Sequence, residues 1–147
     1  MKKSIVFGGL ALFFGAIFIA ACGSGSQPSG QNPIQGKVIK SAAAGNNLTV
    51  TVSNDTGSLK TGEQEFWLAF TDPSGKAVDV GSASFNNHMA AMGSMEAMND
   101  AATLTTTSVP GVYKAKIKVS MAGEWQGQVK YEGPAGNGSA TLSLSAH

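Results

Sequence analysis

The feature that most constrains this chain is a strict alternation of apolar and polar residues, clearest in residues 112–120, VYKAKIKVS. The apolar positions are Tyr113, Ala115, Ile117 and Val119, and the polar positions include Lys114, Lys116 and Lys118. Successive side chains of a β-strand point to opposite sides, so a period of two predicts a strand with one buried face. We interpret the three lysines as a solvated face or as protection of a sheet edge.

Similar patterns predict β-structure for most of the remaining chain. Further strands are predicted over residues 34–42, 47–54, 65–72, 77–86, 102–108, 124–131 and 138–146. Turn signals such as Pro110-Gly111 separate them at the spacing typical of a β-sandwich. The sequence therefore predicts an all-β fold, an immunoglobulin-like antiparallel β-sandwich of seven to eight strands, formed by residues 34–147. A short helix is plausible only within residues 86–100.

The beginning of the chain predicts export and attachment to a membrane. Residues 1–21 carry two lysines followed by a long uncharged apolar run, as a signal peptide does. The run ends in IAAC at 19–22, which resembles a bacterial lipobox, in which the cysteine becomes the lipidated first residue. Cys22 is the only cysteine, so the chain offers neither a disulfide framework nor a thiolate metal site. The alternative is an uncleaved N-terminal anchor.

Lipid on Cys22 would fix the protein to a bacterial membrane outside the cytoplasm, in the periplasm or at the cell surface. A diacylglycerol together with an N-terminal acyl chain such as palmitate anchors strongly, whereas one acyl chain binds only marginally. Residues 22–33 are uncharged and rich in Gly and Ser, which predicts a flexible tether. The chain contains no arginine and no basic cluster of the kind that nucleic-acid binding requires, so we expect no nucleic-acid partner.

The most unusual stretch is residues 86–100, NNHMAAMGSMEAMND, which gathers four of the six methionines behind a histidine. Thioethers and imidazole are soft ligands that select Cu(I), and outside the cytoplasm a thioether avoids the oxidation that thiols undergo. The candidate copper ligands are His88, Met89, Met92, Met95, Met98 and Met121. They are too many for one ion, and Met121 joins them only if the end of the strand at 112–120 lies near this stretch. His147, the last residue, is more simply a frayed terminus.

The three-residue spacing of these methionines leaves the local structure open. In a helix or an extended polyproline-like segment, their sulfur atoms could project to the same side. Two alternatives remain beside copper binding. Methionines often fill gaps in a core, and a methionine-rich surface also binds partner proteins.

The order of these features resembles the YtkA-like domain, and the related FixH-like proteins share the same plan. The resemblance covers residues 34–146 and includes FWLAFTDPSGKAV, the HMAAMGSM segment and GVYKAKIKVSMAGEW. One departure is that Ala90 and Ala91 stand where we expect a proline in the family's methionine segment. The resemblance implies an immunoglobulin-like sandwich outside the cytoplasmic membrane. It also implies a copper chaperone for cytochrome oxidase assembly, with the metal carried by His88 and the methionine segment.

From these features we predict a membrane-anchored extracytoplasmic copper(I)-binding protein that holds the metal for transfer. Its expected partners are membrane lipid, through Cys22, and a cytochrome oxidase subunit or another copper protein. We do not expect an enzyme, because no cysteine lies in the middle of the chain and His88 has no evident nucleophile or carboxylate partner. The alternative is a metal-free interaction or assembly module that docks on a membrane complex through a sheet edge.

Overall fold

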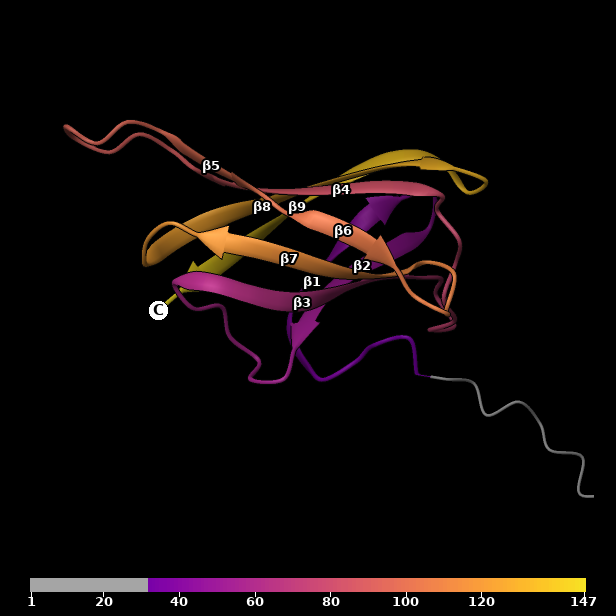
Figure 1. Ribbon diagram of the computed structural model, residues 1–147. Coiled ribbons are helices and arrows are strands. Elements are labelled where there is room, and N and C mark those ends of the chain that lie inside the picture. The colour runs from indigo at the N-terminus through magenta and orange to yellow at the C-terminus, as the bar shows by residue number, and fades with distance from the viewer. Residues whose placement is uncertain (1–31) are drawn as a thin grey trace, which may run out of the picture.

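A computed structural model describes residues 32–147 and shows them as two antiparallel sheets packed face to face (Figure 1). The strands are β1 (Lys37–Gly45), β2 (Leu48–Asn54), β3 (Gly62–Thr71), β4 (Ser82–Met89), β5 (Met98–Ala101), β6 (Thr103–Thr106), β7 (Val112–Val119), β8 (Gly123–Gly133) and β9 (Gly136–Ala146). One sheet has the order β1-β2-β3-β7-β6 and the other β5-β4-β8-β9.

The predicted all-β sandwich is confirmed, although residues 32–147 form nine strands in place of seven to eight. The immunoglobulin-like arrangement stays a prediction. The predicted signal peptide, Cys22 and the tether up to residue 31 lie outside the described residues. Within the described part of the chain, no helix is long and apolar enough to cross a membrane.

Strand β7 shows how the alternating sequence builds the sandwich. Its apolar residues are buried between the sheets, while Lys114, Lys116 and Lys118 are exposed, so the predicted solvated face is confirmed. Lys114 donates a hydrogen bond of 2.7 Å to the carboxylate of Glu65 on the neighbouring strand β3. This hydrogen bond and the lysine's positive charge lower the pKa of the Glu65 carboxyl, because both favour its ionised form.

The core lies between the two sheets and is built mainly from aromatic and branched aliphatic side chains. The largest fully buried ones include Trp125, Phe66, Phe70, Leu59, Leu68, Leu142 and Leu144. Phe66 on β3 and Phe85 on β4 join the sheets through an edge-to-face contact, with ring centroids 4.8 Å apart. Such aromatic contacts add to the stabilisation that burial itself provides.

Two local predictions are wrong. The strand predicted at residues 77–86 begins only at Ser82, because Ala77 forms only an isolated bridge to Thr71 and residues 78–81 are irregular and bend before β4. At this bend the Asp79 carboxylate accepts a hydrogen bond of 2.8 Å from the amide of Gly81. The short helix considered within residues 86–100 does not form either. β4 continues to Met89, and the chain folds back through a turn into β5.

The C-terminus is held in place. The amide of His147 donates to the carbonyl of Leu59 at 3.1 Å, and its carbonyl accepts from the amide of Thr61 at 3.0 Å. The expectation of a frayed terminus is therefore wrong for the backbone of His147. Figure 1 places this end of the chain at the same end of the sandwich as the turn between β7 and β8.

Candidate functional site

The methionine-rich stretch forms a β-hairpin, residues 86–101, which we call the methionine hairpin. Figure 1 shows that its tip extends well beyond the rest of the sandwich. Met89 on β4 is the partner of Met98 on β5 at the end of the regular ladder. Nearer the tip, the amides of Met92 and Met95 donate to each other's carbonyls at 3.1 and 2.9 Å. The four methionines therefore form two cross-strand pairs.

The turn at the tip explains how the hairpin closes. Gly93 and Ser94 are the two residues between the paired Met92 and Met95. Gly93 has a φ of 58°, a left-handed value that glycine adopts without the steric cost that a side chain brings. Glycine at the first central position is typical of tight two-residue hairpin turns. This turn keeps the register that pairs the methionines.

The two pairs lie in different environments. Met89 is only 3% exposed and belongs to the core, whereas Met92 is 61% and Met95 42% exposed. Met98, the partner of Met89, is partly buried against the core. Successive residues of a strand alternate between faces, so a spacing of three places Met89 and Met92 on opposite sides. The hairpin therefore differs from a helical or polyproline-like segment, in which all four sulfur atoms could share one side.

His88 belongs to the outer face of the second sheet, together with the tip. Its ring nitrogen Nδ1 lies 2.9 Å from the side-chain oxygen of Asn99, which also accepts from the amide group of Asn86 at 3.3 Å. Because that oxygen is an acceptor, the contact suits the neutral tautomer with the proton on Nδ1, which leaves the Nε2 lone pair free for a ligand. A hollow of about 350 Å³ lies here, and its lining includes His88, Met89 and Met92.

The base of the hairpin is joined to the turn between β7 and β8, which carries Met121. The Asp100 carboxylate of β5 accepts hydrogen bonds from the amide and the hydroxyl of Ser120, at 2.8 and 2.7 Å. The indole of buried Trp125 donates to the carbonyl of Met121 at 3.1 Å. The condition under which Met121 is a candidate, a strand end close to the methionine stretch, is therefore met.

Gly123 shows how tightly this base is packed. A Cβ added to Gly123 on β8 would lie 3.0 Å from the terminal methyl carbon of Met89. Met121 is two residues before Gly123 and is itself partly buried against the core. Met89 therefore belongs to the core at this end of the sandwich, and Met98 and Met121 are partly buried against the same core.

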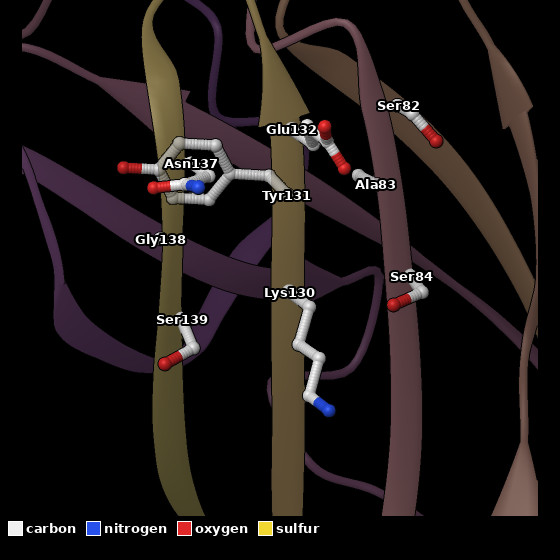
Figure 2. Close-up of a pocket in the computed structure, with 9 residues that line it drawn as sticks. All are labelled: Ser82, Ala83, Ser84, Lys130, Tyr131, Glu132, Asn137, Gly138 and Ser139. Carbon is white, nitrogen blue, oxygen red and sulfur yellow. The ribbon is translucent and has the colours of Figure 1, made fainter.

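A second hollow of about 470 Å³ lies on the outer face of the same sheet, near the opposite ends of its strands. Figure 2 shows Ser82 and Ser84 of β4, Lys130 of β8 and Ser139 of β9 spread across three neighbouring strands. Its lining contains no methionine or histidine, so it offers no soft ligand. In the part of the chain that the structure describes, no three His, Cys, Asp or Glu side chains form a group that could hold a metal ion.

Residues 42–130 match the protein family described as YtkA-like. This span covers more than half of the chain. The chain belongs to the YtkA-like family. The matched region of this YtkA-like protein includes the whole methionine hairpin and Met121, whereas His147 lies outside it. No curated protein and no solved structure matches the chain.

Several residues that shape this YtkA-like site were not evident in the sequence. Asp100 reads as a surface residue, yet it is partly buried and joins β5 to Ser120. Asn87 and Asn99 gave no signal beyond their place beside the methionines, but Asn99 orients the ring of His88. These contacts follow from the register in which β4 pairs with β5. They could be predicted only once the hairpin was known.

Proposed function

We propose that this YtkA-like protein binds Cu(I) outside the cytoplasm and delivers it to another protein while lipid on Cys22 anchors it to a membrane. The observation that carries the proposal is the exposed tip of the methionine hairpin. There, the side chains of Met92 and Met95 are exposed, and Met92 lines a hollow together with His88. Sulfur and imidazole donors of this kind favour Cu(I) over harder ions.

The position of the tip supports transfer more than storage. Thioethers are neutral and need no deprotonation, so they hold Cu(I) without the strength of thiolates. An ion on exposed side chains is also within reach of a receiving protein. Figure 1 shows the tip and the N-terminal end of the described residues at opposite ends of the sandwich. A tether from Cys22 would therefore present the tip away from the membrane, toward a cytochrome oxidase subunit or another copper protein.

A role in cytochrome oxidase assembly or in copper homeostasis rests on what the family resemblance implies. We propose that the protein acts by binding and not by catalysis. The described contacts of His88 support this, because its Nδ1 binds a carboxamide and not a carboxylate that could form a catalytic relay.

A second candidate function is a metal-free interaction module. The exposed side chains of Met92 and Met95 favour it, because flexible methionines on a surface adapt to the shape of a protein partner. In that case the tip would contact another protein of a membrane complex, and the sulfur atoms would serve only as apolar surface. The two functions predict different results when leucine replaces methionine. Copper binding requires the sulfur atoms, whereas an apolar contact surface does not.

Anaerobic titration with Cu(I), in competition with a chromophoric chelator, tests the proposal on the purified full-length protein in detergent. The test variant carries leucine at Met89, Met92, Met95 and Met98, since leucine conserves apolar volume but lacks sulfur. His147→Ala is a matched control, because it removes the other histidine of the chain. We expect the wild type and the control to take Cu(I) from the chelator and the leucine variant to lose this ability.

The result that would overturn copper binding is a folded wild type that takes no Cu(I) from the chelator. A circular dichroism spectrum typical of β-structure in all three proteins shows that the comparison is fair. If partner binding by the protein also survives the four leucine substitutions, the metal-free module is the better description.

A further inference from the structure

The methionine hairpin divides its soft side chains between two places. One place is the outer face and tip, where His88 and Met92 line one hollow and Met95 pairs with Met92 across the turn. The other is the base, where Met89 and Met98 oppose each other and the β7–β8 turn brings in Met121. Met89 also borders the hollow that His88 and Met92 line, but it is only 3% exposed and its terminal methyl carbon lies against Gly123, so its side chain belongs to the base.

The base contains enough donors for a separate site. Directly opposed residues of an antiparallel ladder hold their Cβ atoms about 5 Å apart, so the thioethers of Met89 and Met98 are neighbours. The methyl group of Met89 reaches toward Gly123, which lies two residues beyond Met121 in the chain. Three thioethers are a donor set that suits Cu(I).

A buried cation also needs compensation for the water that it loses, and the base provides two polar groups. Asn87 is fully buried, and within residues 32–147 neither polar atom of its side chain has a hydrogen-bond partner. Buried polar groups are nearly always paired, so this amide is an exception that calls for an explanation. Asn87 lies two residues before Met89, on the same face of β4, with its dipole available to a bound ion.

The second polar group is the Asp100 carboxylate. Asp100 is the partner of Asn87 in the ladder and lies two residues from Met98. Its hydrogen bonds to Ser120 fix it beside the turn that carries Met121. A carboxylate beside the proposed site offsets part of the cost of placing a monovalent cation among apolar side chains.

The outer set differs in chemistry and in access. It combines one imidazole nitrogen, His88 Nε2, with the thioethers of Met92 and Met95 at an exposed tip. The base offers sulfur alone and is largely shielded from solvent, since Met89 is only 3% exposed. An ion at the tip should therefore exchange more quickly than an ion at the base.

We propose that the protein has two Cu(I) sites on opposite faces of the methionine hairpin: an inner site of Met89, Met98 and Met121, and an outer site of His88, Met92 and Met95. This inference rests on the proposed copper-binding function. The inner site retains its ion, and the outer site exchanges Cu(I) with the receiving protein. Asn87 and Asp100 support the inner ion without ligating it.

The test is anaerobic Cu(I) titration of the full-length protein in detergent, with X-ray absorption at the copper edge to identify the donor atoms. Two double variants are compared, Met92→Leu/Met95→Leu for the outer site and Met98→Leu/Met121→Leu for the inner site. We expect two equivalents of Cu(I) in the wild type and one in each variant. The ion left in the outer-site variant should show sulfur neighbours only, and the ion left in the inner-site variant should include a nitrogen neighbour.

A further variant tests the inner site without touching a donor. Asp100→Asn keeps the shape of the side chain and removes its charge, and Glu96→Gln removes a charge from the exposed part of the hairpin as a control. We expect Asp100→Asn to weaken the tighter equivalent about ten-fold, as for other supporting residues around metal sites, and Glu96→Gln to leave that equivalent unchanged.

The outcomes separate the two proposals. A wild type that binds one equivalent, weakened alike by both double variants, would overturn the two-site inference while copper binding stands. Two equivalents that both show nitrogen neighbours would also overturn it. A folded wild type that binds no Cu(I) would overturn the proposed function and the inference together.

Discussion

The base and the tip of the methionine hairpin contain the same kind of residue in two opposite settings. At the base, Met89 is buried in the core, and β5 is tied to the β7–β8 turn through Asp100. At the tip, Met92 and Met95 are held by two reciprocal backbone hydrogen bonds and are largely exposed. The difference arises from a spacing of three residues on a ladder whose faces alternate every residue.

This contrast shows that a methionine cluster in the sequence need not be one cluster in space. The side chains at the base contribute to the stability of the fold, whereas those at the tip contribute little to it and are free for contact with a ligand or partner. Substitutions at the base should therefore lower the free energy of unfolding more than matched substitutions at the tip.

The largest effect is expected from truncating the buried methionine. Met89→Ala should lower the free energy of unfolding by about 2–5 kcal/mol, because it removes buried apolar surface and leaves a cavity. Met92→Ala should change it by less than about 0.5 kcal/mol, as an exposed substitution usually does. Chemical denaturation of both variants measures the difference. Equal losses would show that the tip is packed as firmly as the base.

The glycines of the two regions should differ in a similar way. A Cβ added at Gly127, on β8 opposite Asn87, would lie 2.8 Å from a methyl carbon of Leu144 and 3.0 Å from the ring of Phe85. Gly127→Ala should therefore cost about 1–3 kcal/mol through overpacking. The same denaturation experiment measures this loss.

Gly93→Ala is the matched substitution at the tip, where an added Cβ meets open space. Its strain comes only from the positive φ and should open the turn locally, with a global change below about 0.5 kcal/mol. Hydrogen exchange should show faster exchange at the amides of Met92 and Met95. A large fall in global stability would mean that the tip folds as one unit with the core.

The sequence predicted the sandwich well where alternation was regular and failed where pairing between distant residues decided the structure. β7 was predicted almost to its ends, because its pattern of buried and exposed residues is uninterrupted. β5 was missed, since Met98–Ala101 is only four residues long and has no alternation of its own. Met95, Glu96 and Ala97, just before this strand, favour a helix intrinsically, but the pairing of the hairpin with itself prevails.

The arrangement of the candidate site could not be predicted from the sequence, and its metal ligands stay a prediction. Met121 was a candidate only if its strand end lies near the hairpin, and the hydrogen bonds between Ser120 and Asp100 meet that condition. The division of the methionines between two faces could not be predicted, because it depends on the register of Met89 with Met98. Asp100 and Ser120, twenty residues apart, gave no sequence signal for their contact.

That contact provides the next test of the base. Asp100→Ala removes the acceptor of two hydrogen bonds from Ser120 and should cost about 1 kcal/mol, because the carboxylate is partly exposed and water can replace it in part. It should also speed hydrogen exchange across β5. Asp55→Ala serves as the control, since Asp55 is an exposed aspartate in the loop that follows β2. If both variants lose the same stability, the bond between β5 and the turn contributes nothing specific.

The smallest effect on stability is expected from oxidation of the tip. Hydrogen peroxide converts accessible methionines to sulfoxides, so Met92 and Met95 should react faster than Met89, by on the order of ten-fold or more. Peptide mass spectrometry after a short exposure measures each rate. The free energy of unfolding of the same sample should be unchanged within about 0.5 kcal/mol. Oxidation in denaturant, where all methionines are equally exposed, provides the reference rates. If Met89 reacts as fast as Met92 in the folded protein, the base opens to solvent as readily as the tip, and the contrast between the two regions does not hold in solution.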